Sequence, residues 1–283
     1  MTARITETAK AKVNLALHVL GRRADGYHEL DSVVAFADVG DLLSIETAQE
    51  LSLSCTGRFA GDVPHGSDNI IIKAWHCLAK VMARRGVVLP KVHVNLTKNL
   101  PVASGIGGGS SDAAALLRGV LALNRFELST AEICQLAQDL GADVPVCFYG
   151  KQAHMQGMGD NVSPLMIEIP RAIVLVNPLV ACATPDVFRE MGLAKGQIFG
   201  TPVNLYDQHY WRNDMTTAAL LVQPVIATVL AALGEEPTLN YVRMTGSGAT
   251  CFGLSNSMAQ ASAAAARLSV KNPNWWVQAA QLG

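Results

Sequence analysis

The chain has 283 residues, of which half are hydrophobic and 16% are charged, and its formal net charge is −1. This length accommodates one large domain or two of ordinary size, either with a substantial core. The balanced charge excludes a broad electrostatic surface for nucleic acid or anionic membrane. We therefore expect no nucleic-acid partner and no membrane association, and any phosphate recognition has to be local.

The cysteines and the apolar segments indicate a cytoplasmic protein. Six cysteines are scattered without a Cys-x-x-Cys pair, a spacing that indicates neither a zinc ribbon nor a disulfide framework. Near the N-terminus, Asn14 and His18 interrupt a short apolar run and no cleavage site follows, so a signal peptide is not expected. The apolar stretch 218–233 contains Gln223 and Pro224 and is too short to cross a bilayer, which predicts a buried helix with a kink or break.

Strand patterns dominate the first third of the chain. Alternating apolar and polar residues predict a strand over 12–20, and a charged turn follows at 22–27. Apolar residues at helical spacing predict a helix over 69–85. Further strands are expected at 32–36, 41–46, 51–55 and 92–97.

Helices and strands mix in the remainder without a regular β-α-β alternation, so an α+β fold is favoured over a doubly wound sheet. A helix is expected over 111–124, and the capping box Ser129-Thr-Ala-Glu132 predicts another that ends near Gly141. Later strands are expected at 153–156, 166–169 and 173–176, helices from 184 and 213, and after 252 an alanine-rich helix and a terminal strand. We place the division near Ser163, which gives domains 1–163 and 164–283.

The segment Pro-Val-Ala-Ser-Gly-Ile-Gly-Gly-Gly-Ser-Ser-Asp, from Pro101 to Asp112, is the clearest functional signal. Glycine permits positive φ and close approach to a ligand, and the helix that follows offers unpaired N–H groups to an anion. The segment lacks the lysine of a Walker loop and the spacing of a Rossmann turn, and the chain has no His-Arg-Asp or Asp-Phe-Gly. We interpret it as a nucleoside-triphosphate cradle rather than a flexible linker.

Two further sites fit the other needs of phosphoryl transfer, positive charge and a group that deprotonates or positions the nucleophile. Lys12 lies beside Asn14 on the first strand, where a lysine can stabilise developing negative charge. A solvated edge-strand lysine is the alternative, and residue type alone favours it. Asp143, in Gly-Ala-Asp-Val-Pro, is a candidate general base and equally a candidate N-cap of a short helix from Val144.

Other signals are weaker. Tyr27 and His28 follow the Asp25-Gly26 turn, where they can stack on a base, although loop aromatics are more often packing residues. The histidines show no His-x-x-x-His spacing, so a zinc site is not expected. No Gly-x-Ser-x-Gly occurs, which leaves no case for a hydrolase.

Lys12-x-Asn14, the loop from Pro101 to Ser111 and Thr245-Gly-Ser-Gly248 together resemble the three ordered motifs of the GHMP kinase superfamily. Gly21-Arg-Arg-Ala-Asp-Gly-Tyr-His28 and Leu140-Gly-Ala-Asp-Val-Pro145 resemble its branch that phosphorylates 4-diphosphocytidyl-2-C-methylerythritol. The resemblance extends from about Lys12 to Phe252. It implies transfer of the γ-phosphate of ATP, with Mg²⁺, to the 2-hydroxyl of that substrate in non-mevalonate isoprenoid synthesis, by a monomer or weak homodimer.

The resemblance also implies roles for individual residues, with Asp143 as the base and Lys12 as its charged partner. The implied substrate-binding residues are Asn14, Tyr27, His28, Asp143, Thr184 and Phe188. The implied ATP-binding residues are Asn69, Lys98, Pro101, Val102, Ala103, Ser104, Gly105, Ile106, Gly107, Gly108, Gly109, Ser110 and Ser111. The third glycine motif is Thr245, Gly246, Ser247 and Gly248. The Mg²⁺ ligands are not identified, with Ser110 or Ser111 as candidates.

The implied fold has two α+β domains, the first similar to domain 2 of ribosomal protein S5 and the second similar to ferredoxin. One alternative is another GHMP kinase, such as a homoserine or mevalonate kinase, and the Asp-Gly-Tyr-His turn argues against it. The other is a nucleotide-binding regulator without turnover, and the presence of both Lys12 and Asp143 argues against that. The region 192–211 matches no motif.

Overall fold

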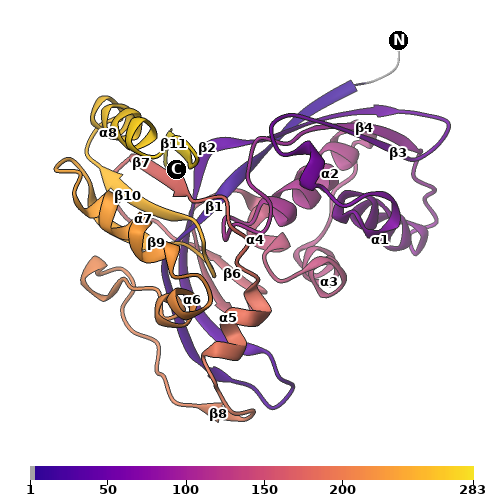
Figure 1. Ribbon diagram of the computed structural model, residues 1–283. Helices are drawn as coiled ribbons and strands as arrows, with labels where there is room; N and C mark the ends of the chain where they lie inside the picture. The colour runs from indigo at the N-terminus through magenta and orange to yellow at the C-terminus, as the bar shows by residue number, and fades with distance from the viewer. Residues whose placement is uncertain (1–3) are drawn as a thin grey trace. The chain divides into compact units, whose positions relative to one another are not determined.

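Two long strands, β1 (Arg4–Arg22) and β2 (His28–Thr47), contribute to both of the compact units of the computed structural model, which describes residues 4–283 (Figure 1). Of the described residues, the first unit contains 4–11, 40–102 and 108–150. The second contains 12–39, 103–107 and 151–283. Each unit has a hydrophobic core of its own.

The first unit packs helices on a sheet formed by the second half of β2 with β4 and β3. β4 runs antiparallel to β2 and parallel to β3. Leu78, Leu96 and Leu116 are fully buried in its core. The elements are β3 (Ser52–Thr56), 3₁₀ turns at Ala60–Asp62 and Gly66–Asp68, α1 (Ile70–Ala83), β4 (Val92–Thr97), α2 (Gly108–Asn124), α3 (Thr130–Leu140) and α4 (Val144–Tyr149).

The second unit contains a four-stranded antiparallel sheet in the order β11-β7-β10-β9. The chain order strand, helices, two strands, helix, strand with this spatial order is that of a ferredoxin-like domain. α7 packs on β9 and β10, and α8 packs on β7 and β11 (Figure 1). The elements are β7 (Ala172–Asn177), α5 (Thr184–Glu190), α6 (Thr216–Val222), α7 (Val225–Gly234), β9 (Asn240–Met244), β10 (Cys251–Ser255), α8 (Met258–Lys271) and β11 (Trp276–Gln281).

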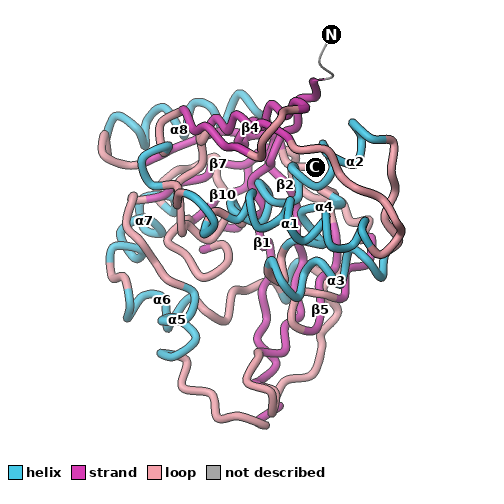
Figure 2. Tube along the Cα trace, turned by 90° about the vertical axis from the view of Figure 1, so that its right-hand side faces the viewer, coloured by secondary structure: helices cyan, strands magenta, loops and turns pink. Residues whose placement is uncertain are grey.

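The hairpin of β1 and β2 also belongs in part to the second unit, where short strands extend it. β5 pairs antiparallel with the first half of β2, β6 pairs with β5, and β8 pairs with the end of β1. Figure 2 shows this region as paired strands joined by loops. The elements are β5 (Ala153–Gly157), β6 (Asn161–Pro164), β8 (Gln197–Ile198) and a 3₁₀ turn at Gln208–Tyr210.

Most predicted elements are present, although several differ in extent and one is absent. The predicted strands 32–36 and 41–46 are one strand, because β2 continues without a break through Asp38 and Gly40. The predicted strand 166–169 is wrong: the chain there is irregular and the Met166 side chain is 91% exposed. The helix of the glycine loop begins at Gly108, three residues earlier than predicted.

The capping box and the helix break are confirmed. Ser129 N donates to Glu132 Oε2 (2.8 Å) and Glu132 N donates to Ser129 Oγ (3.3 Å) at the start of α3. The apolar stretch forms α6 and α7, separated at Gln223 and Pro224. The domain division near Ser163 stays a prediction. Along the chain, the last boundary between the two compact units lies between Gly150 and Lys151.

Candidate active site

Residues 103–107 of the glycine loop lie against the third glycine motif in the second unit. Gly105 has a φ of +77°, and a Cβ added there would lie 2.6 Å from Thr245 O and 2.7 Å from Gly248 O. A residue with a side chain cannot occupy this position without displacing the backbone of the other segment. The two glycine segments therefore form one closely packed structure.

Polar side chains outside the predicted set hold this structure together. Ser104 O accepts hydrogen bonds from Thr250 N (3.2 Å) and Thr250 Oγ1 (2.6 Å). Thr250 Oγ1 in turn accepts from Asn177 Nδ2 (2.8 Å), and Asn213 Nδ2 donates to Gly246 O (2.8 Å). Sequence reasoning missed these residues because their partners lie far along the chain; only Thr250 is near a motif.

Lys12 is buried in the second unit, with 4% of its surface exposed, so the alternative of a solvated edge-strand lysine does not describe it. Its backbone N donates to Ile106 O (2.9 Å). Gly107 has a φ of +64°, and a Cβ added there would lie 3.1 Å from Lys12 Cβ and 3.3 Å from Lys12 Cε. The lysine stem therefore runs along the bare Cα of the glycine loop.

Asn14 connects the first motif with the third. Its backbone N donates to Thr245 Oγ1 (2.8 Å), and its Nδ2 donates to Ser32 Oγ (2.8 Å), which donates to Ala16 O (2.6 Å). Asn14 Oδ1 is buried and has no hydrogen-bond partner within residues 4–283. This amide oxygen is therefore an acceptor available to a ligand.

Two of the predicted substrate-binding residues, His28 and Phe188, lie against each other in the second unit. Thr184 and Phe188 are one helical turn apart on α5, and the Phe188 ring stacks on His28 with centroids 3.8 Å apart and an interplanar angle of 7°. Burial, and secondarily the Arg22 guanidinium, lower the pKa of His28, and its Nε2 is buried without a partner in the described chain. The neighbouring Tyr27 is 61% exposed.

Thr184 also contacts the third glycine motif. Its Oγ1 lies 2.8 Å from Ser247 Oγ, and Cys182 Sγ donates to Ser247 O (3.1 Å). The start of α5 is therefore fastened to the segment that packs on the glycine loop. Within the second unit, contacts therefore connect the Lys12-x-Asn14 motif, residues 103–107 of the glycine loop and the third glycine motif.

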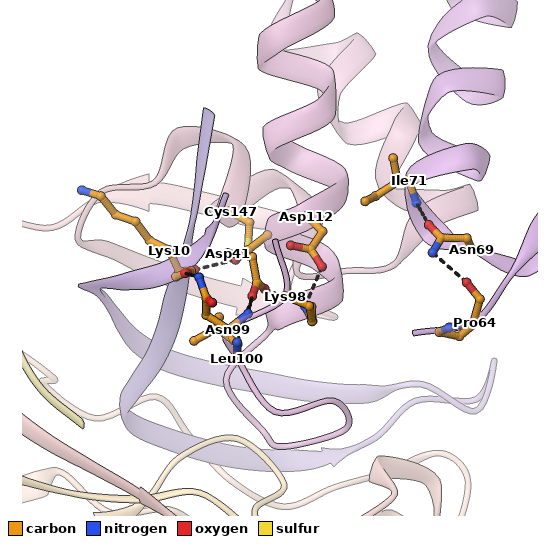
Figure 3. Close-up of polar contacts among 12 residues, drawn as sticks. Lys10, Asp41, Pro64, Asn69, Ile71, Lys98, Asn99, Leu100, Asp112 and Cys147 are labelled. Carbon is orange, nitrogen blue, oxygen red and sulfur yellow. Dashed lines mark hydrogen bonds and ion pairs between the residues drawn. The ribbon is translucent and has the colours of Figure 1, made fainter. Parts of the chain in front are cut away.

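In the first unit, Lys98 is buried between two carboxylates (Figure 3). Its Nζ lies 2.6 Å from Asp41 Oδ2 and 2.6 Å from Asp112 Oδ2. A Cβ added to Gly108 would lie 3.3 Å from the same Nζ, so the ammonium lies beneath the first residue of α2. Asn69, another residue implied to bind ATP, makes separate contacts: its Oδ1 accepts from N of Ile71 (2.8 Å) and caps α1.

Asp143 occupies the N-cap position of α4, and its carbonyl accepts from Cys147 N (3.1 Å). Its side chain makes no hydrogen bond to the first turn of α4. The N-cap alternative is therefore correct for the position of Asp143 but not for capping by its side chain. Ser111 Oγ is buried and donates to Lys10 O (2.8 Å), whereas Ser110 is half-exposed. Lys12 and Asp143 belong to different units.

Known proteins are similar to this chain over its whole length. Family models for the GHMP kinases N terminal domain and the GHMP kinases C terminal match residues 69–151 and 204–273. The 4-diphosphocytidyl-2-C-methyl-D-erythritol kinase of Paramagnetospirillum magneticum is 44% identical, with 97% of each chain covered. The kinase of the same name from Rhodopseudomonas palustris (strain BisB5) is 43% identical, with 100% of each chain covered. The chain belongs to the 4-diphosphocytidyl-2-C-methyl-D-erythritol kinase family.

Solved structures agree with the family. The crystal structure of a 4-(cytidine 5′-diphospho)-2C-methyl-D-erythritol kinase is 30% identical and covers 99% of each chain with a TM-score of 0.79. A homoserine kinase from Cytophaga hutchinsonii matches with a TM-score of 0.66 at 16% identity, which shows a shared fold alone. The predicted α+β, two-domain GHMP fold is confirmed.

Membership of the 4-diphosphocytidyl-2-C-methyl-D-erythritol kinase family makes the chain a small-molecule kinase, and such a kinase implies ATP as co-substrate. The individual site residues stay predictions. No helix within residues 4–283 combines the length and the apolar character needed to span a bilayer.

Proposed function

We propose that the chain transfers the γ-phosphate of ATP to the 2-hydroxyl of 4-diphosphocytidyl-2-C-methyl-D-erythritol, with Mg²⁺ accompanying the nucleotide. Relatives that carry the name of this kinase are 41–44% identical over 97–100% of the chain, which supports the proposal. The reaction belongs to non-mevalonate isoprenoid synthesis and takes place in the cytoplasm.

The observation that supports this choice of substrate is the stacked pair of His28 and Phe188. A stacked imidazole and phenyl ring, with the exposed Tyr27 ring beside them in sequence, offers flat surfaces to a nucleobase. The buried, unpartnered Nε2 of His28 offers a hydrogen bond, and its lowered pKa favours a neutral ring. Homoserine and mevalonate contain no base, so a site for either has no use for this arrangement.

On the acceptor side, Asp143 takes the proton of the 2-hydroxyl and Lys12 balances the charge. The backbone of Asp143 is fixed at the start of α4, and the Lys12 stem is held against the glycine loop. Asn14 Oδ1 accepts a hydrogen bond from the methylerythritol moiety.

On the ATP side, the glycine loop and the first turn of α2 hold the phosphates. Mg²⁺ usually binds few protein ligands besides substrate phosphates, and Ser110 is the half-exposed hydroxyl of the cradle that fits it better than the buried Ser111. When bound, Mg²⁺ would neutralise charge on the transferred phosphoryl group. Lys98, whose ammonium is paired with two aspartates, would stabilise the start of α2 directly after the glycine loop.

A coupled assay of ADP release tests the proposal with 4-diphosphocytidyl-2-C-methyl-D-erythritol, homoserine and mevalonate as alternative acceptors. We expect turnover with the first only. Asp143→Asn should lower kcat by about 10²–10⁴-fold, the usual contribution of general base catalysis, while the KM for ATP changes little. Turnover of either other alcohol at a comparable kcat/KM would contradict the substrate, and a near-normal kcat in Asp143→Asn would remove Asp143 as the base.

A further inference from the structure

The side chain of Arg22 binds both the turn that carries Tyr27 and His28 and the segment after α5. Arg22 is the last residue of β1, and its Nε donates to Gly26 O (3.1 Å) within the turn. Its Nη1 donates to Leu193 O (3.1 Å), 171 residues away. A single guanidinium thus binds carbonyls of two segments, which its planar fork suits.

These two segments carry the two members of the aromatic pair. Gly26 lies two residues before His28, and Leu193 lies five residues after Phe188, just beyond the end of α5. The rings of His28 and Phe188 are stacked at 3.8 Å. Arg22 therefore joins the two backbones within a few residues of the rings.

Other contacts place residues 193–198 against the same turn. The β8 residues Gln197 and Ile198 pair with Arg22 and Gly21. A Cβ added to Gly26 would lie 3.4 Å from Lys195 Cε, so the lysine stem crosses the turn. This segment is part of the region to which the sequence assigned no role.

We infer that Arg22 is a positioning residue for cytidine recognition, which holds the Tyr27–His28 turn and the α5 segment at the separation that the base requires. The inference rests on the proposed function. Arg22 need not touch the substrate: its two hydrogen bonds hold the backbones that carry His28 and Phe188. The nearby guanidinium also lowers the pKa of His28, after the larger effect of burial, and so favours the neutral ring.

Arg22→Ala tests this inference, with Arg23→Ala as the matched control. Arg23 is the adjacent arginine and carries the same charge, but its guanidinium pairs with Asp25 and Glu29 inside the turn region, not with the α5 segment. We expect Arg22→Ala to raise the KM for the cytidyl substrate about tenfold, as for the loss of hydrogen bonds from a charged donor. The KM for ATP and kcat should change by less than about twofold, and Arg23→Ala should change all three by less than about twofold.

An equal KM for the cytidyl substrate in the two variants would overturn the inference, as would a parallel rise in the KM for ATP. If Arg22→Ala fails to fold, Arg22→Lys decides: it keeps the charge but not the fork, so a rise of at least threefold in the same KM is expected and an unchanged KM overturns the inference.

Direct binding of CDP, measured by calorimetry, separates this inference from the proposed function. If wild-type protein turns over another alcohol, the proposed function fails. The inference then stands only if wild-type protein binds CDP more tightly than Arg22→Ala by about tenfold, and it falls if the two affinities are equal or if neither protein binds CDP.

Discussion

Lys98 carries one positive charge between two carboxylates, so its cluster with Asp41 and Asp112 has an excess negative charge when all three are ionised. Asp41 Oδ1 accepts from the backbone N atoms of Asn99 (2.6 Å) and Leu100 (2.9 Å), whereas Asp112 Oδ1 has no partner among residues 4–283. Burial, reinforced by the Asp41 carboxylate and opposed by Lys98, raises the pKa of Asp112 to about 8. At neutral pH, Asp112 is therefore the carboxyl that holds a proton.

Removing the cation should be far more harmful than removing this carboxyl. Lys98→Met leaves two buried acidic groups without a counter-ion, and we expect a loss of about 3–5 kcal/mol in the free energy of unfolding. Asp112→Asn keeps the shape of a protonated carboxyl and requires no proton uptake, so it should not destabilise the protein at pH 7. Urea denaturation at pH 7 measures both, and equal losses would contradict this account of the cluster.

The pH dependence of the same pair tests the protonation. The folded-state pKa of Asp112 lies above its ordinary value of 3.8, so its proton stabilises the folded state most at low pH, and this stability is lost as pH rises toward 8. The wild-type free energy of unfolding minus that of Asp112→Asn should therefore fall by roughly 1 kcal/mol per pH unit between pH 5 and 7. A difference that is constant or rises with pH would show that Asp112 is ionised.

The sequence predicted Lys98 as a site residue but not its partners. Asp41 lies 57 residues before Lys98, and no periodicity links a strand residue to a loop residue at that distance. The same holds for Asn213, which binds the third motif from 33 residues away. Motifs identify residues that are adjacent in sequence, whereas the side chains that support them depend on the finished fold.

At the scale of elements, two glycine segments of the second unit pack backbone against backbone. Their separation is set by the absence of a side chain at Gly105, whose φ is positive. The interpretation of the loop as a phosphate cradle explains its glycines by the close approach of a ligand to the backbone. At Gly105 the structure adds a second reason, because this residue faces the backbone of Thr245 and Gly248.

Gly105→Ala should therefore destabilise the protein in addition to any effect on ATP. The positive φ alone costs about 1–2 kcal/mol for a residue with a Cβ, and the overlap with Thr245 O adds to it. Gly109→Ala is the matched control, because a Cβ there meets only Ile70 Cγ2 at 3.8 Å and the residue is in α2. We expect a loss above about 2 kcal/mol for the first and no loss for the second in urea denaturation, since alanine favours helix. Equal stabilities would contradict the close packing.

Local sequence signals predicted elements well where a short motif or a single residue determines the backbone conformation. The capping box located α3, and Pro224 separated α6 from α7. Prediction failed where tertiary pairing outweighs local preference. β2 runs through Asp38 and Gly40, which locally favour a break, because its two halves pair with different partners, β5 in the second unit and β4 in the first.

For the whole molecule, the α+β class followed from the order of elements, but the ferredoxin-like strand order did not. That order came from the resemblance to GHMP kinases, because propensity does not specify which strands become neighbours. The division near Ser163 assumed contiguous domains, whereas each compact unit here includes separate segments, with β1 and β2 shared between them. A linear reading of composition does not detect a strand that contributes to both units.

The phosphorylated product tests the central claim, that this kinase phosphorylates the 2-hydroxyl of 4-diphosphocytidyl-2-C-methyl-D-erythritol. Carbon 2 bears a methyl group and no hydrogen, so a phosphate ester on its hydroxyl has no three-bond coupling to a proton. We predict that proton-coupled ³¹P NMR of the wild-type reaction shows one new, unsplit phosphomonoester resonance that grows with ADP while the diphosphate resonances of the substrate persist. A monoester resonance split by protons, or inorganic phosphate alone, would contradict it.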